Sequence, residues 1–267
     1  METKHKIVRD AYVFGYPLVT MDMVRKHETN VRVPDGAHAP MGQLIKLRSY
    51  PPVDDHAAAA PNADTLYTMV WLDVSSEPWV FGIPDMGDRY YIMPMLNGFN
   101  EPFFVAGSRT TGGKAQEYAV TGPGWSGALP QGVTKVESPT ALVWILGRIY
   151  CSGPDDYSAV HELQDRYSSV PLSVYGEPYT PPPGDLDEAV DMETAVREQV
   201  NHLPLEEFFR YLAELLKTNP PKPEDAEIVE RMAEIGIVPG QDFDSSKLPM
   251  LGHKLDPKLA LLELVRT

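Results

Sequence analysis

The chain has 267 residues, of which 43% are hydrophobic, and it carries a formal net charge of −15. It is therefore long enough to bury a sizeable core, and its negative field opposes binding to nucleic acid or to an anionic membrane surface. A single cysteine, Cys151, excludes an internal disulfide framework, while the polar start METKHKIVRD and the lack of a membrane-length apolar run favour a cytoplasmic protein.

The first predicted element is a helix over residues 4–28, which Pro17 is expected to kink or split. Its apolar residues recur at intervals of three and four, namely Ile7, Ala11, Phe14, Leu18 and Met21. Residues 29–61 are rich in proline and show little periodicity. We expect a long surface connection there, of a kind that often carries function.

From Thr65 to about Tyr150 the pattern changes to short runs typical of β-strands, separated by Gly, Pro, Asn and Asp. The runs are TLYTMVWLDV, PWVFGIP, RYYIMPML, PFFVAG, QEYAVTG, VTKVES and TALVWILGRIY. Their spacing, with no helix between strands, predicts an antiparallel β-sandwich or barrel and disfavours a doubly wound nucleotide-binding fold.

Helical patterns return after Gly153. They are DDYSAVHELQDRY, DLDEAVDMETAVREQVNHL, PLEEFFRYLAELLKT, PEDAEIVERMAEIG and DPKLALLELVRT. We therefore predict an α+β chain with an N-terminal helix and loop over residues 1–64, a β-rich core over 65–152 and a group of helices over 153–267. We expect these parts to form one compact domain, with YTPPPGD (Tyr179 to Asp185) as the best linker candidate.

Several motifs come close to known signatures without matching them. GSRTTGGK has the wrong spacing for a phosphate loop and is followed by a strand, and HELQD lacks the second histidine of a zinc-protease helix. The other histidines are scattered, so we expect no metal and no cofactor. Arg109 and the glycines of GSRTTGG offer a backbone nest for an anion, but an ordinary hairpin tip is the favoured interpretation.

Asn62 and Asp64 precede the first strand and have two interpretations. Both side chains readily bond to nearby backbone N–H groups and so start turns. Alternatively, Asp64 pairs with Arg148, because ALVWILGR has the apolar character of a buried strand and a buried guanidinium needs a partner. Such a pair is either structural or the polar floor of a pocket.

The rings that would wall such a pocket are Tyr67, Tyr90, Tyr91, Trp125 and Trp144, although aromatic residues in strands more often belong to the core. The candidate catalytic residues are Asp64, Tyr67 and Arg148. The candidate ligand-binding residues are Asn62, Thr65, Arg89, Tyr91, Arg109, Trp125 and Trp144.

Six stretches in one order resemble the family catalogued as domain of unknown function 1254: AYVFGYPLV, NADTLYTMVWLDVS, PDMGDRYYIMPMLNGF, GSRTTGG, YAVTGPGW and PTALVWILGRIY. The resemblance runs from about Ala11 to Arg148 and continues more weakly to about Leu248. It implies a β-rich core with surrounding helices, often followed by a second β-rich domain, number 1214, which we expect this chain to lack. Ala63 stands where family members usually have an arginine.

Three functions follow as hypotheses. The first is a bacterial-type small-molecule enzyme whose pocket lies at one end of the sandwich, with Asp64 as acid or base and an arginine holding an anionic group. The second is a binding protein for a hydrophobic or anionic ligand, with an aromatic-lined cavity and no titratable group at its centre. The third is an interaction module that forms a homodimer or docks on a separate partner domain.

Overall fold

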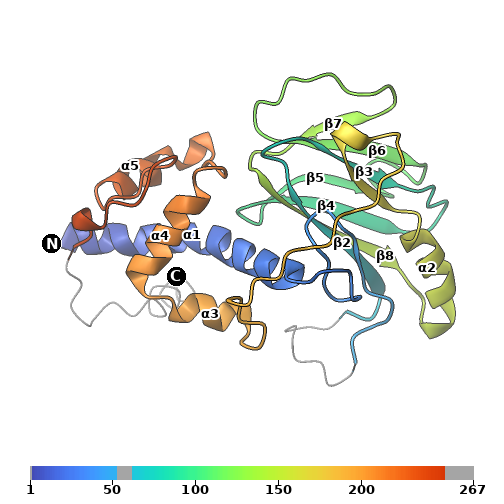
Figure 1. Cartoon of the computed structure of the whole chain (residues 1–267), viewed down its shortest axis with the longest axis horizontal. Helices are drawn as coiled ribbons and strands as arrows, with labels where there is room; N and C mark the ends of the chain where they lie inside the picture. The colour runs from blue at the N-terminus through green and yellow to red at the C-terminus, as the bar shows by residue number, and fades with distance from the viewer. Residues whose placement is uncertain (1, 53–61, 250–267) are drawn as a thin grey trace. The chain divides into compact units, whose positions relative to one another are not determined.

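Figure 1 shows the protein as a computed structural model, which describes residues 2–52 and 62–249. The chain forms two compact units, and each is described by itself. Unit 1 comprises Met1–Val24, Gly98–Asn100 and Met192–Thr267, and unit 2 comprises Arg25–Asn97 and Glu101–Asp191. The divisions expected at residues 64 and 152 do not coincide with these units.

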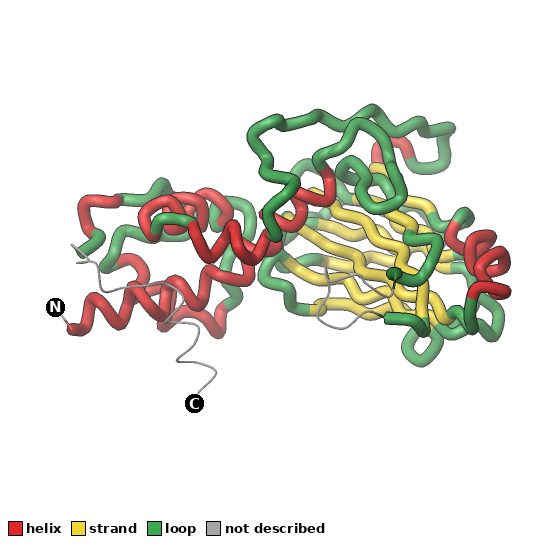
Figure 2. Tube along the Cα trace, turned by 90° about the horizontal axis from the view of Figure 1, so that it is seen from below, coloured by secondary structure: helices red, strands yellow, loops and turns green. Residues whose placement is uncertain are grey.

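Unit 2 contains two sheets, whose strands are yellow in Figure 2. The five-stranded sheet has the order β1 (Ile45–Lys46), β2 (Thr65–Asp73), β8 (Leu142–Tyr150), β4 (Tyr91–Asn97) and β5 (Pro102–Gly107). The four-stranded sheet has the order β7 (Thr134–Glu137), β6 (Gln116–Thr121), β3 (Trp79–Ile83) and β9 (Ser168–Pro171). Neighbouring strands are antiparallel except for β6 and β7, which are parallel.

Alternate residues of both sheets face each other and form the core of unit 2. The five-stranded sheet contributes Leu66, Val70, Leu72, Val143, Ile145 and Ile149, and the four-stranded sheet contributes Phe81, Ile83, Tyr118 and Val120. Since successive side chains of a strand point to opposite faces, this pattern is that of two stacked sheets. The predicted α+β class with a sandwich-like core is confirmed.

All seven predicted strands are present, whereas the short strands β1 and β9 were not anticipated. After β8 the chain forms a short 3-10 turn (Pro154–Asp156) and helix α2 (Tyr157–Gln164), and a second 3-10 turn (Leu172–Val174) follows β9. Residues 185–195 were predicted to be helical, but the helix there, α3, covers only Val196–His202. The segment before it is largely exposed and therefore lacks the packing that would stabilise a helix.

Unit 1 is helical. Helix α1 (Glu2–Thr29) begins in it, and Pro17 lies inside this helix without splitting it. Its face carrying Ile7, Val8 and Ala11 shares a core with Phe208, Phe209 and Leu212 of α4 (Leu205–Leu215), and α5 (Ala226–Ala233) adds Met232. Further 3-10 turns are Pro223–Asp225 and Ser245–Lys247. The helix predicted at residues 256–267 lies outside the described residues.

Within the part of the chain that the structure describes, no helix combines the length and the apolarity needed to cross a bilayer.

Candidate functional site

The Asn62 side chain forms the turn that starts β2. Its Oδ1 accepts the backbone N–H of Asp64 at 2.8 Å and that of Thr65 at 3.3 Å, and its Nδ2 donates to the Thr65 hydroxyl at 2.6 Å. Nδ2 also lies 3.3 Å from the Tyr67 hydroxyl. The turn interpretation therefore accounts for Asn62 and Thr65, and it links both residues to Tyr67.

Asp64 and Arg148 do not pair, which corrects the expectation from the sequence. Arg148 lies opposite Tyr67 in the β2–β8 ladder, with its guanidinium 5.3 Å from the centre of that ring, and its side chain is exposed. Asp64 lies in the bend just before β2, where its backbone carbonyl accepts the N–H of Cys151 at 3.0 Å. The apolar run around Arg148 covers both faces of β8, but the outer face at this position is open to solvent.

Asp64 is exposed and lies near Tyr50. Burial, and then contacts with Cys151, raise the pKa of Tyr50 to about 12, and the charges of Tyr157 and Asp64 add to this effect. Tyr50 donates a hydrogen bond to the Cys151 carbonyl at 2.6 Å. Asp64 therefore lies beside the hydrogen bond between Tyr50 and Cys151.

Two further candidates have structural partners. Arg89 holds Asp156 through two contacts of 2.6 and 2.8 Å and donates to the Tyr150 carbonyl at 2.9 Å. Tyr91 is fully buried, and its hydroxyl donates to the Gly112 carbonyl at 2.7 Å. Both residues stabilise the sandwich.

The glycine-rich turn after β5 does not form an anion nest. The N–H groups of Thr110, Thr111 and Gly112 all donate to the Gly107 carbonyl, at 2.9 to 3.1 Å, so they are turned inward. Arg109 is exposed and stacks over Tyr90, with 5.3 Å between the guanidinium and the ring centre. The hairpin-tip interpretation accounts for this segment.

The two candidate tryptophans belong to separate elements. Trp144 stacks on Trp71 across β8 and β2, with 4.7 Å between ring centres and planes 5° apart. Trp125 lies in the loop between β6 and β7, where its carbonyl accepts from Lys135 at 2.8 Å. Of the candidate residues, Asn62, Thr65 and Arg148 lie around Tyr67, and the others lie elsewhere in unit 2. None of the candidates lines the pocket described next.

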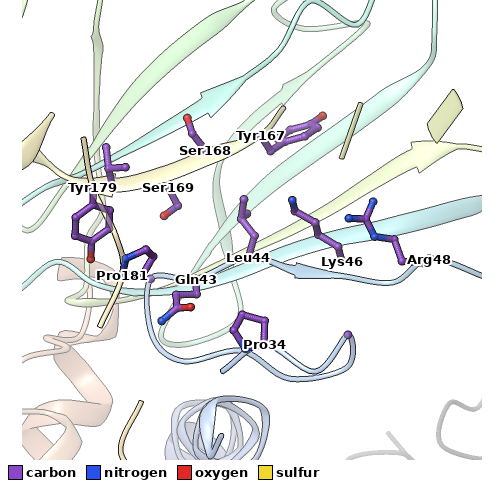
Figure 3. Close-up of a pocket in the computed structure, with 13 residues that line it drawn as sticks. Pro34, Gln43, Leu44, Lys46, Arg48, Tyr167, Ser168, Ser169, Tyr179 and Pro181 are labelled. Carbon is purple, nitrogen blue, oxygen red and sulfur yellow. The ribbon is translucent and has the colours of Figure 1, made fainter. Parts of the chain in front are cut away.

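A pocket of about 470 Å³ lies in unit 2 between the edge strands of the two sheets. We call it the edge pocket (Figure 3). One wall comes from β1 and its approach, with Gly42–Leu44, Lys46 and Arg48, and the other from β9 and the preceding residue, Tyr167–Val170. Pro34 and Gly36 border it from the connection before β1, and Tyr179 and Pro181 from the segment after β9.

The segment expected to be a linker is fixed beside this pocket. Gln43 donates from its side-chain amide to the Pro182 carbonyl at 2.8 Å, and the N–H of Gly184 donates to the Arg32 carbonyl at 2.8 Å. Residues 179–184 therefore pack on the connection before β1 and form part of a wall.

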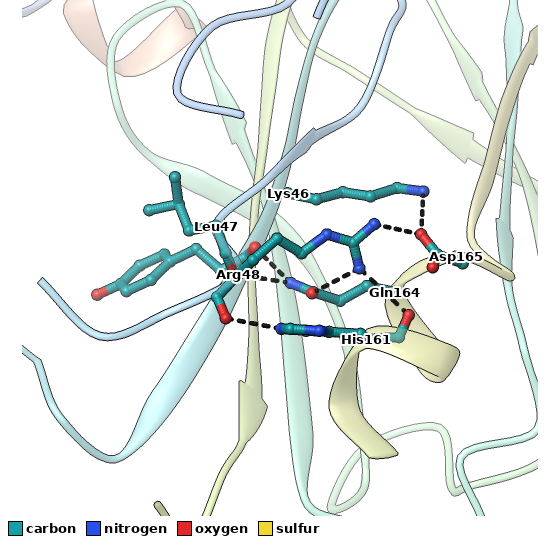
Figure 4. A network of polar contacts seen from close by, with 7 residues as sticks. Lys46, Leu47, Arg48, His161, Gln164 and Asp165 are labelled. Atoms are coloured by element: carbon teal, nitrogen blue, oxygen red, sulfur yellow. Dashed lines mark hydrogen bonds and ion pairs between the residues drawn. The ribbon is translucent and has the colours of Figure 1, made fainter. Parts of the chain in front are cut away.

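Polar contacts tie the cationic end of the pocket to α2 (Figure 4). Arg48 donates to the His161 carbonyl at 3.2 Å and to the side-chain oxygen of Gln164 at 3.1 Å, and it also contacts the Asp165 carboxylate. His161 donates back to the Arg48 carbonyl at 2.6 Å. Gln164 is fully buried, and its amide donates to the carbonyls of Leu47 and Tyr67.

Lys46 has a freer position than Arg48. Its ammonium lies 3.1 Å from Asp165, and an ammonium has three donors. Hydrogen bonds from Arg48 and Lys46 lower the pKa of Asp165 against the opposing effect of burial, with the Arg48 contribution the larger. Asp165 is thus ionised at neutral pH, and it offsets part of the positive charge at this end of the pocket.

The Ser169 hydroxyl in the opposite wall is buried and has no hydrogen-bond partner among the described residues. A buried hydroxyl left unpaired costs about 1–3 kcal/mol, so such a group calls for a partner that the protein itself does not supply. Ser168 points the other way, over Gly82 of β3.

Sequence reasoning missed the edge pocket, although two signals were present. The run IKLR places Lys46 and Arg48 two residues apart, which in an extended segment puts both side chains on one side. The proline-rich connection was expected to carry function, and it supplies one wall of the pocket. Within residues 2–52 and 62–249, no three His, Cys, Asp or Glu side chains are placed to hold a metal ion together.

Residues 41–171 match the model of a family described as protein of unknown function, DUF1254. This part of the chain belongs to the DUF1254 family. The DUF1254 region includes the two strand-borne walls of the edge pocket, from Gly42 to Arg48 and from Tyr167 to Val170, whereas Pro34, Gly36, Tyr179 and Pro181 lie outside it. No curated protein matches the chain.

A solved structure has a similar fold. It is the crystal structure of the VPA0106 protein from Vibrio parahaemolyticus, with a TM-score of 0.67 and 23% sequence identity. The match covers 98% of this chain and 59% of that one, so the present chain spans little more than half of its neighbour's length. At this identity the likeness establishes the fold alone.

Proposed function

We propose that the DUF1254 region binds a small, largely apolar ligand with an anionic group in the edge pocket, without chemical conversion. The observation that carries this proposal is the pairing of an apolar and aromatic lining with cationic Lys46 and Arg48 at one end. In a chain with a formal charge of −15, two cations at one end of a pocket provide local attraction for an anion.

The enzyme hypothesis has less support. As the structure describes the pocket, its lining contains no Asp, Glu or His to act as acid or base. Asp64, the residue expected to fill that role, is exposed and does not line the edge pocket. Binding by shape and charge needs no acid or base, so it agrees better with this lining than catalysis does.

Filling the pocket tests the proposal. The probe is 8-anilinonaphthalene-1-sulfonate, an apolar anion whose fluorescence increases in apolar sites. Leu44 lies in the middle of the edge pocket (Figure 3), so Leu44→Trp should weaken dye binding at least tenfold in a fluorescence titration. Leu186→Trp adds the same ring at a half-exposed position that does not line the pocket, and it should leave binding unchanged.

Equal dye affinity in wild type and folded Leu44→Trp would contradict the proposal, because the dye would then bind elsewhere. Circular dichroism spectra of both variants establish that the comparison is made between folded proteins.

A further inference from the structure

The edge pocket has two chemically different ends separated by an apolar middle. Gln43, at the end of the turn before β1, and Lys46 in β1 are three residues apart, hence at most roughly 10 Å at about 3.3 Å per residue. Figure 3 shows Ser169 on the side of Tyr179, Pro181 and Gln43, and Lys46 and Arg48 on the other side of Leu44. A ligand that reaches both ends must therefore be elongated and cross Leu44.

At the cationic end, Lys46 is the group able to hold an anion. Arg48 already donates to His161, Gln164 and Asp165, so its guanidinium is committed to the contact between β1 and α2. Among the described residues, the Lys46 ammonium pairs only with Asp165, so it keeps hydrogen-bond donors for a ligand. Because the Asp165 carboxylate is 3.1 Å from the ammonium, a second negative charge on the ligand would be repelled there. This favours a singly charged group such as a carboxylate.

The opposite end favours a neutral hydrogen-bond acceptor. The unpaired Ser169 hydroxyl is a donor there, and Gln43, Tyr179 and Pro181 bring no positive charge. Burial, and then the charge of Glu77, raise the pKa of Tyr179, so its hydroxyl is neutral at this end. A second carboxylate would lose its hydration and meet no cation at this end, whereas a carbonyl or ester oxygen satisfies Ser169 without adding charge.

We propose, on the basis of the function proposed above, that the ligand is an elongated organic acid with one carboxylate at Lys46, an apolar chain over Leu44 and a neutral carbonyl-type acceptor at Ser169. The ligand class is thus a monocarboxylate that carries an ester, ketone or amide at its far end. Neither a simple fatty acid nor a dicarboxylate meets both ends of the pocket.

Four compounds of matched length test this class by titration calorimetry. Monomethyl suberate has the carboxylate and the acceptor, octanoate lacks the acceptor, dimethyl suberate lacks the charge, and suberate has a second carboxylate. Monomethyl suberate should bind at least tenfold more tightly than each of the other three. Affinities of all four compounds within twofold of one another would overturn the inference.

Two variants assign the ends. Ser169→Ala should bind monomethyl suberate and octanoate equally well but should still prefer monomethyl suberate to dimethyl suberate. Lys46→Met should bind monomethyl suberate and dimethyl suberate equally well but should still prefer monomethyl suberate to octanoate. Lys114→Met removes a surface lysine that also pairs with an aspartate, at 3.3 Å from Asp85, and it should preserve both preferences. If either variant kept the preference assigned to it, that end of the ligand would be wrongly placed.

The two proposals fail in different ways. If Leu44→Trp weakens dye binding but monomethyl suberate binds no more tightly than the other three compounds, the pocket binds ligands and the proposed ligand class is wrong. If the dye is insensitive to Leu44→Trp, the pocket itself is not the binding site. The compound series on wild-type protein decides the class even where a variant does not fold.

Discussion

Arg89 and Asp156 show how a single ion pair fixes the end of β8. Arg89 contacts both carboxylate oxygens and also the Tyr150 carbonyl, while the N–H of Ser152 donates to Asp156 at 3.0 Å. The hydrogen bonds from Arg89, and then the one from Ser152, lower the pKa of Asp156 to about 2. Both side chains are largely shielded from solvent, so this pair is stronger than an exposed one.

Asp156→Asn should therefore lower the free energy of unfolding at neutral pH by about 1–2 kcal/mol, since one pKa unit corresponds to about 1.4 kcal/mol. The folded pKa is depressed, so the contribution is present above the unfolded value of about 3.9 and is lost as the pH falls toward 2. Urea unfolding at pH 7 and pH 3 measures whether the difference in the free energy of unfolding between wild type and Asp156→Asn becomes smaller at the lower pH. Asp155→Asn changes the exposed neighbour and should have little effect at either pH. A constant difference between wild type and Asp156→Asn over this range would contradict the assignment.

At the scale of elements, the turn before β1 depends on a glycine that also borders the edge pocket. Gln43 N–H donates to the Pro40 carbonyl at 3.0 Å, and Gly42 has φ of +78° at the third position of this turn. A Cβ at Gly42 would lie 2.0 Å from the Trp79 ring. The turn therefore requires glycine both for its conformation and for the close approach of β3.

Gly42→Ala should lower the free energy of unfolding by about 2–4 kcal/mol, which combines the cost of a left-handed alanine with that of overpacking. Gly36→Ala is the matched control: its φ is +99°, but a Cβ there meets no atom within 4 Å. It should cost only about 1 kcal/mol. Denaturant unfolding compares the two, and equal losses would show that contact with Trp79 contributes nothing.

The strands that the sequence predicted differ from those that it missed in how clearly their residues show a strand pattern. The longest predicted strands, such as β2, carry apolar residues that face the core because both sheets bury one face, as at Leu66, Val70 and Leu72. Strand β1 has only two residues, and β9 has the sequence SSVP, whose two serines and final proline are not typical of a strand. The edge pocket lies between these two strands, and its walls meet only through tertiary packing.

The candidate residues show the same limit. The turn at Asn62 could be predicted because its hydrogen bonds are local in sequence. The exposure of Arg148 could not be predicted, because it depends on which elements cover the outer face of β8. Similarly, Arg89 has its partner Asp156 far along the chain, so its role became visible only in the folded sandwich.

At the scale of the whole molecule, the net charge of −15 opposes the approach of any anionic ligand. Salt screens this long-range repulsion, because the Debye length falls from about 30 Å at 0.01 M to about 8 Å at 0.15 M ionic strength. The association rate of 8-anilinonaphthalene-1-sulfonate should therefore rise by roughly two- to fivefold over this range. Stopped-flow fluorescence measures it. The uncharged N-phenyl-1-naphthylamine is the control, and an equal rise for both dyes would exclude an electrostatic cause.

The strands that border the edge pocket also carry features that limit the addition of a further strand. An open sheet edge presents unpaired backbone groups to which a strand of another molecule can add, and proteins limit this with short edge strands, lysine and proline. On this side of unit 2 the two edges are the two-residue β1, which contains Lys46, and the four-residue β9, which ends in Pro171. Features that shape the edge pocket thus also shorten and charge the edges at which strand addition would begin.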